Sequence, residues 1–204
     1  MMSIMYPFDL ISDHYRRDEM PTANQEDNEA TYLSWIEEFG SVLDPGARVL
    51  DLGSGAGIRA TKLLADAGFT VTGVDISQVQ IDRARSLVPN AEFVHADMAV
   101  WKRVPANFDG IVSLYFMIHL PLGDQRNLIP RLAEWLTPSG YLLAIVGHQP
   151  WIGVENYFGA PMFWEHADTM SYLSWFTDVG LIPLWDRFIP EGNSGHTLLL
   201  ARKH

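Results

Sequence analysis

The chain has no cysteine, few basic residues and no long hydrophobic run, and each shortage excludes something. Without cysteine there are no disulfides, thiolate nucleophiles or cysteine-bound metals. Only 14 Lys and Arg face 25 Asp and Glu, so the formal net charge of −11 argues against nucleic acid or an anionic membrane as a partner. No apolar stretch approaches the ~18 residues of a membrane span. We therefore expect a protein that binds a small molecule.

Length and the N-terminal residues set the remaining general expectations. The 204 residues, 48% of them apolar, suffice for one globular domain with a sizeable core and leave no room for a separate substrate domain. Met1 to Leu10 lack the basic and apolar regions of a secretory signal peptide, so we expect a cytoplasmic location.

Short apolar runs alternate with segments of helical spacing along most of the chain. Parallel strands joined by crossover helices produce this alternation. The turn residues of 190–195 predict that the last two strands pair antiparallel. The expected strands are Arg48–Leu52, Val71–Val74, Glu92–His95, Ile111–Leu114, Tyr141–Val146, Leu181–Ile189 and Thr197–Ala201. The sequence thus predicts an α/β fold, a doubly wound seven-stranded sheet with helices on both faces.

Two segments fall outside the alternation. We interpret residues 1–43 as a helical lid or appendage, and residues 147–167 as an insertion on the substrate side, where Gly147–Trp164 forms a loop rich in aromatic side chains. Residues 44–146 are the expected ligand-binding core, and residues 168–204 supply the final helix and hairpin.

A glycine-rich turn joins the first strand to the next helix. It carries Asp51, Gly53, Ser54, Gly55 and Gly57, so the backbone can approach a ligand while helix N–H groups are available to bind it. A dinucleotide fingerprint also fits, Gly55-x-Gly57-x-x-Ala60, with Asp75 about 20 residues on. The fingerprint makes an NAD(P)-dependent oxidoreductase the alternative interpretation. Asp51 argues against it, because its carboxylate would repel the pyrophosphate of a dinucleotide but attract the ammonium group of another ligand.

The motifs as an ordered set resemble those of class I S-adenosylmethionine-dependent methyltransferases of the small-molecule type. Beyond the glycine-rich turn, the set comprises Asp75 ending the second strand, His95-Ala-Asp97-Met98 after the third and Phe108-Asp-Gly-Ile-Val112 opening the fourth. Leu136–Leu143 resembles the family's turn into the fifth strand, with Ser139 where a glycine is more usual. The resemblance implies a Rossmann-like sheet of order 3-2-1-4-5-7-6 with the last strand antiparallel.

The resemblance also implies a cofactor and its contacts. S-adenosyl-L-methionine would be bound by its methionine part at Asp51 and the Gly53–Gly55 backbone, and by its ribose hydroxyls at Asp75. Ile76 and Met98 would lie against the adenine, and Asp97 would accept from its amine. The implied cofactor residues are Asp51, Gly53, Ser54, Gly55, Gly57, Asp75, Ile76, Asp97, Met98 and Leu114. The implied reaction methylates a small organic acceptor and releases S-adenosylhomocysteine.

Histidines and aromatic residues are the candidates for the acceptor side. His119 follows the fourth strand and His148 the fifth, and either can act as general base toward a hydroxyl or phenol. The predicted contacts to an apolar or aromatic acceptor are Tyr15, Trp151, Trp164 and His166. Core packing beneath a long loop is the alternative role for the aromatic residues. The seven histidines show no metal-ligand spacing such as H-x-x-x-H, so we expect no metal.

Fold alone does not fix activity, so one more alternative stays open. A protein with this fold and cofactor site can act without methyl transfer, as a regulatory protein, a cyclase or an isomerase.

Overall fold

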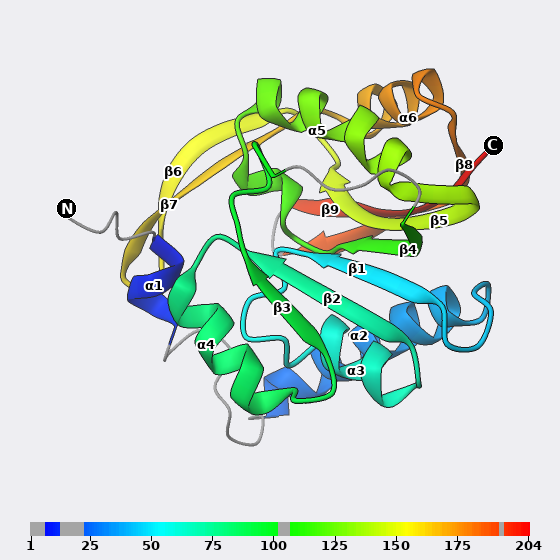
Figure 1. Ribbon diagram of the computed structural model, residues 1–204. Helices are drawn as coiled ribbons and strands as arrows, with labels where there is room; N and C mark the ends of the chain where they lie inside the picture. Colours follow the sequence, from blue (N-terminus) through cyan, green and yellow to red (C-terminus); the bar gives the residue numbers. More distant parts are fainter. Residues whose placement is uncertain (1–6, 13–22, 102–106, 192–193) are drawn as a thin grey trace.

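The computed structural model describes residues 7–12, 23–101, 107–191 and 194–204, and its centre is a seven-stranded sheet in the order β3-β2-β1-β4-β5-β9-β8 (Figure 1). The strands are β1 (Arg48–Leu52), β2 (Thr70–Asp75), β3 (Glu92–His95), β4 (Phe108–Ser113), β5 (Leu136–Gly147), β8 (Leu181–Glu191) and β9 (Ser194–Lys203). The first five strands along the chain pair in parallel, and β9 is antiparallel to both β5 and β8. The expected order and the antiparallel last strand are confirmed.

Helices cover both faces of this sheet, as Figure 1 shows. They are α1 (Pro7–Ile11), α2 (Ala23–Gly40), α3 (Ala60–Asp66), α4 (Gln78–Leu87), the 3-10 turn η1 (Met117–His119), α5 (Leu122–Trp135) and α6 (Thr169–Asp178). One buried apolar cluster joins the sheet to α5 and α6, and a second joins the opposite face to α2, α3 and α4. α5, for example, buries Leu128, Leu132 and Trp135 on one apolar stripe, as its spacing predicts.

The chain direction places one end of every central strand at the same edge of the sheet. The carboxyl ends of β1 to β5 meet there, and the antiparallel pairing brings the end of β8 and the start of β9 to the same edge. Ligands of doubly wound sheets bind at this edge because the connecting loops leave a crevice there.

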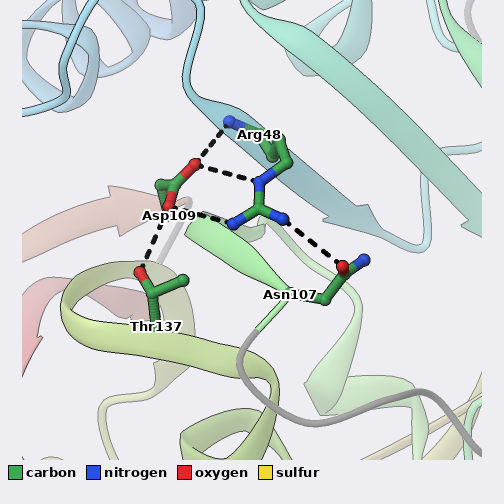
Figure 2. Close-up of polar contacts among 4 residues, drawn as sticks. All are labelled: Arg48, Asn107, Asp109 and Thr137. Carbon is green, nitrogen blue, oxygen red and sulfur yellow. Dashed lines mark hydrogen bonds and ion pairs between the residues drawn. The ribbon is translucent and has the colours of Figure 1, made fainter.

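A polar cluster connects β1, β4 and β5 at the opposite end of the strands, where β1 and β4 begin (Figure 2). Arg48, at the start of β1, donates from its backbone N–H to Asp109 Oδ2 at 2.9 Å and from its guanidinium at 3.3 Å. Thr137 Oγ1 donates to Asp109 Oδ1 at 3.2 Å, and the guanidinium also reaches Asn107 Oδ1 at 3.4 Å. These contacts hold β1, β4 and β5 in register, and they lie away from the carboxyl-end edge.

The loop expected over Gly147–Trp164 is wrong, because most of this segment forms a hairpin. β6 (Trp151–Tyr157) and β7 (Ala160–His166) pair antiparallel in a second, two-stranded sheet. Phe158 and Gly159, the two turn residues, have φ of 49° and 91°, the positive values of a type I′ turn. Asparagine-glycine usually marks this turn, so the phenylalanine concealed the signal.

Ser139 shows why the family favours glycine at this position. Its φ is 64°, in the left-handed region that glycine adopts without a steric cost and serine does not.

Candidate functional site

A cavity of about 280 Å³ lies at the carboxyl-end edge of the sheet. One side is formed by the turn after β1 and the end of β2, and the other by the loop after β4, η1 and β7. Pro7 and Phe8 of α1 also line it, so a segment from the N-terminal region contributes to the wall.

The glycine-rich turn brings the main chain up to the cavity. Gly53 and Gly55 line it with φ of 70° and 54°, and Gly57 follows at 73°. A Cβ added to Gly53 would lie 2.7 Å from the Cβ of Phe116, another lining residue. Only a residue without a side chain fits between this turn and the wall.

Asp75 is the carboxylate that the structure fixes most firmly at the cavity. It is 8% exposed, its Oδ2 accepts from the Gly55 N–H at 2.9 Å, and its Oδ1 accepts from the Ser77 N–H at 2.8 Å. Burial raises the pKa of Asp75, although these two hydrogen bonds oppose the rise. Each oxygen retains a second lone pair, so the group suits a vicinal diol such as ribose.

The cavity brings together six of the ten predicted cofactor residues. They are Gly53, Gly55, Asp75, Ile76, Met98 and Leu114. Asp51 is buried behind the turn and accepts from Thr61 Oγ1 at 2.5 Å. Asp97 is exposed, and its Oδ1 accepts from the Ala99 N–H at 2.9 Å. Neither carboxylate is part of the lining.

Ser54 and Gly57 also lie outside the lining, next to it in the turn. Ser54 Oγ is buried and has no hydrogen-bond partner within the described part of the chain. A Cβ on Gly57 would lie 2.9 Å from the Phe93 ring, so this glycine serves the packing of the turn against β3.

His119 lies in the wall opposite Asp75. Its Nδ1 is 3.0 Å from the carbonyl oxygen of Phe163, which can only accept, so Nδ1 carries the hydrogen and the lone pair of the neutral ring is at Nε2. The imidazole is held between the Trp164 ring, 4.1 Å away between centroids, and the Phe8 ring at 5.1 Å. Trp164, which was predicted to contact the acceptor, packs on His119 and is not part of the lining.

Of the other predicted acceptor residues, His148, Trp151 and His166 are not part of the lining. His148 Nδ1 is within 3.1 Å of Thr197 Oγ1 and 3.3 Å of Thr169 Oγ1, and Trp151 is 49% exposed on β6. His166 packs against Gly147, where an added Cβ would lie 2.2 Å from its Nδ1. Burial and the neighbouring His196 lower the pKa of His166. Tyr15 lies outside the described residues.

Met162 and Phe163 of the lining lie in the aromatic-rich segment that was expected on the substrate side. Phe8, Gln80 and Tyr115 also line the cavity but were not among the predicted contacts. Tyr115 directly follows the predicted Leu114. The described residues contain no group of three histidine, aspartate or glutamate side chains able to hold a metal. No helix among them is both long and apolar enough to cross a bilayer.

The sheet order, the glycine-rich turn and the buried Asp75 together define the class of S-adenosylmethionine-dependent methyltransferase folds. Residues 49–140 match the family model described as a methyltransferase domain, so the resemblance is confirmed and this segment belongs to the class I S-adenosylmethionine-dependent methyltransferases. The family is S-adenosylmethionine-dependent, which identifies the cofactor.

Individual relatives agree with this family. A trans-aconitate 2-methyltransferase of Paracidovorax citrulli is 41% identical over 103 residues, 49% of this chain and 38% of that protein. The chain therefore aligns with less than half of that relative's length. The solved 1,6-didemethyltoxoflavin-N1-methyltransferase of Burkholderia thailandensis, with its acceptor and S-adenosylhomocysteine bound, superposes with a TM-score of 0.72 at 20% identity, over 97% of this chain and 86% of the other.

One structural neighbour has a different reaction in its name. The [4+2]-cyclase SpnF superposes with a TM-score of 0.68 at 18% identity, over 84% of this chain and 81% of the other. Likeness at this level establishes the fold alone, so the reaction has to be argued from the site.

Proposed function

We propose that this protein transfers a methyl group from S-adenosyl-L-methionine to a small organic acceptor and releases S-adenosylhomocysteine. The observation that carries the proposal is that one cavity joins the glycine-rich turn and Asp75 to a wall of aromatic side chains and His119. The bound cofactor supplies a methyl group already activated on a sulfonium. The chain has to align an acceptor with it and exclude water.

Asp75 is proposed to accept hydrogen bonds from both ribose hydroxyls, with Ile76 and Met98 against the adenine. The main chain at Gly53 and Gly55 then faces the methionine part, and Asp51 supports the turn from behind through Thr61. These roles are consistent with the lining, which includes the Asp75 carboxylate and the apolar Ile76 and Met98.

The acceptor is proposed to be apolar or aromatic. The described lining contains Leu114, Phe116, Leu120, Met162 and Phe163 but no arginine or lysine. Trans-aconitate, named for the relative above, carries three carboxylates, and the described lining residues offer no guanidinium or ammonium group to pair with them. His119 lines the same part of the cavity as these side chains and is proposed to contact the acceptor.

The two alternatives have less support. An oxidoreductase would use the Gly55-x-Gly57-x-x-Ala60 register, but Gly57 packs on Phe93 and is not part of the lining. Titration calorimetry with S-adenosylhomocysteine and with NADH separates the two cofactors, and tight binding of NADH alone would contradict the proposal. A panel of phenols, heteroaromatic amines and trans-aconitate, assayed for S-adenosylhomocysteine release, separates methyl transfer from binding without transfer.

Asp75→Ala tests the cofactor site itself. We expect at least tenfold weaker binding of S-adenosylhomocysteine, about 1.4 kcal/mol, because both ribose contacts are lost. Asp97→Ala is the matched comparison, and we expect a loss below about threefold because its carboxylate is exposed and outside the lining. Unchanged affinity in Asp75→Ala would refute the ribose role. An equal loss in both variants would place Asp97 at the adenine amine.

A further inference from the structure

Gln80, in the first turn of α4, is a polar residue of the cavity lining to which the function proposed above gives no role. It is only 3% exposed, and its Oε1 accepts from Nη1 of Arg83 at 3.4 Å. Within the described part of the chain, nothing accepts from its amide NH2 group. Buried polar groups nearly always have a partner, so two unused donors in a cavity wall indicate a ligand with a hydrogen-bond acceptor.

Arg83 determines which end of the Gln80 amide is available. A guanidinium only donates, so the amide oxygen is the end that meets Arg83, and the NH2 group is left for a ligand. Arg83 is not part of the lining. Its Nη1 also donates to the carbonyl oxygen of Ser12, directly after α1, and to Ser12 Oγ at 2.7 Å. The orientation of Gln80 is therefore set from outside the cavity, by a residue that also holds α1.

Ser77 connects Gln80 to the carboxylate of Asp75. The Ser77 N–H donates to Asp75 Oδ1 at 2.8 Å, and Ser77 Oγ caps α4 by accepting from the Gln80 N–H at 3.1 Å. A sugar hydroxyl that donates its hydrogen to Asp75 keeps lone pairs on its oxygen, and these need a donor. Gln80, which lines the same cavity, supplies that donor. The two side chains together suit a hydroxyl group, which both donates and accepts.

The contacts that hold α1 on the cofactor side come from the same part of α4. α1 has only five residues, and a helix this short is not stable without contacts to the rest of the protein. Ser77 Oγ donates to Asp9 Oδ1, and Arg83 donates to Ser12. Ser77 and Arg83 are also the residues that bond to Gln80. The positions of α1 and of Gln80 therefore depend on the same two side chains.

α1 also contacts the acceptor wall, through η1 and β7. The ring of Phe8 lies edge-on to His119, with centroids 5.1 Å apart. Ile11 is buried together with Ala160 and Met162 of β7. Phe8, His119 and Met162 all line the cavity. One short helix thus connects α4 to the wall that the acceptor is proposed to meet.

We propose that Gln80 donates a hydrogen bond to a ribose hydroxyl oxygen of the cofactor, and that it thereby couples cofactor binding to the position of α1. The inference rests on the ribose position proposed above for Asp75. The bound ribose holds the Gln80 amide, the amide oxygen holds Arg83, and Arg83 holds Ser12. Such coupling is reciprocal, so the contacts of α1 strengthen cofactor binding by the same factor by which the cofactor stabilises α1.

A calorimetric cycle tests the ribose contact. Gln80→Met, similar in volume but without donors, should bind S-adenosylhomocysteine about tenfold more weakly. Gln78→Met is the matched control, two residues earlier and exposed on α4, and should stay within about twofold of the wild type. The 2′-deoxy and 3′-deoxy analogues of S-adenosylhomocysteine should bind the wild type more weakly. For one of them the loss should be at least about fivefold smaller in Gln80→Met, because the partner of the missing oxygen is already absent.

Two results of this cycle would overturn the ribose contact. One is an equal loss for each deoxy analogue in the wild type and in Gln80→Met. The other is a coupling with the 3-deaza analogue alone, which would assign Gln80 to the adenine ring. Absence of S-adenosylhomocysteine binding by the wild type would instead refute the cofactor site of the proposed function.

Nitrogen-15 NMR of glutamine-labelled protein supplies a readout on the wild type itself. S-adenosylhomocysteine should shift the side-chain NH2 resonances of Gln80, which are identified by their loss in Gln80→Met or, if that variant does not fold, in Gln80→Glu. Unshifted resonances at saturating S-adenosylhomocysteine would refute the contact.

Hydrogen–deuterium exchange tests the coupling to α1. S-adenosylhomocysteine at saturating concentration should slow the exchange of residues 7–12 at least about threefold in the wild type. The slowing should be less than about half as large in Gln80→Met and in Arg83→Met, each saturated with the same ligand. Equal slowing in all three proteins would contradict the coupling.

Discussion

The cofactor side and the acceptor side of the cavity are built from different kinds of contact. Gly53, Gly55 and Asp75 lie directly after or at the end of neighbouring strands, and the hydrogen bonds that join them to each other, to Val74 and to Ala96 span 20 or 21 residues. On the acceptor side, His119 meets Phe163 across 44 residues and Tyr115 meets Glu191 across 76. The cofactor side is therefore determined locally, whereas the acceptor side depends on how β7, β8 and β9 dock. This difference predicts separable effects of substitution.

The largest effect is expected for a glycine of the cofactor side. Gly53→Ala should weaken S-adenosylhomocysteine binding at least about thirtyfold, about 2 kcal/mol, because the new methyl group forces Phe116 toward the cavity. Titration calorimetry measures the affinity of each variant for S-adenosylhomocysteine. Gly46→Ala is the matched control, since its φ of 75° is equally unfavourable for alanine but its Cβ would meet no atom within 4 Å. Both variants should lose about 1 kcal/mol of stability from the left-handed backbone, and Gly53→Ala should lose more because its methyl group meets Phe116. Equal loss of affinity would contradict a direct role of Gly53.

The next effect is expected in the buried network that docks the acceptor side. Gln125 is fully buried, donates to the carbonyl oxygens of Leu120 and Glu165 at 2.8 and 2.6 Å, and accepts from the hydroxyl of Tyr172. Burial raises the pKa of Tyr172, so it remains a donor at all ordinary pH values. Tyr172→Phe leaves the Gln125 carbonyl without this donor and should cost about 1–2 kcal/mol in the free energy of unfolding.

Urea denaturation of Tyr172→Phe and of Tyr141→Phe measures the contrast. Tyr141 has no hydroxyl hydrogen bond within the described residues, and we expect its variant to lie within about 0.5 kcal/mol of the wild type. S-adenosylhomocysteine affinity should change little in either variant. A large affinity loss in Tyr172→Phe would show that the two sides are coupled.

How far the sequence predicts each side follows from the same difference. The sheet order and cofactor residues such as Asp75 and Met98 could be predicted because strand ends and turn glycines are local features. The hairpin was missed because Phe158 occupies a turn position that usually signals with asparagine. Phe8 and Tyr115 were missed because their place in the wall depends on packing between segments far apart in the chain.

A smaller effect concerns pH and the acceptor side. The pKa of His166 is lowered, so the unfolded chain takes up a proton before the folded one as the pH falls below the ordinary value of 6.5. Stability that His166 supplies at neutral pH is therefore lost between 6.5 and its folded pKa. In His166→Gln the fall in Tm from pH 7 to pH 5 should be smaller by about 2 °C. An identical fall in both proteins would show that His166 does not carry this acid sensitivity.

The smallest effect is expected at the edge of the sheet away from the cavity, the cluster of Figure 2. The contacts with Arg48 outweigh desolvation and keep the pKa of Asp109 below its usual value, so its contribution is present above about pH 3.8 and is lost as the pH falls through the folded pKa. The ion pair is exposed, and Asp109→Asn should cost only about 0.2–1 kcal/mol at neutral pH. Urea denaturation at pH 7 and pH 3 should show that the difference in stability between Asp109→Asn and the wild type is smaller at the lower pH.

The S-adenosylhomocysteine affinity of Asp109→Asn should be unchanged, because neither Asp109 nor its partners line the cavity. A fall in affinity beyond about twofold would mean that the pairing of β1 with β4 affects the conformation of the glycine-rich turn. The cofactor side would then depend on more distant contacts than its own hydrogen bonds.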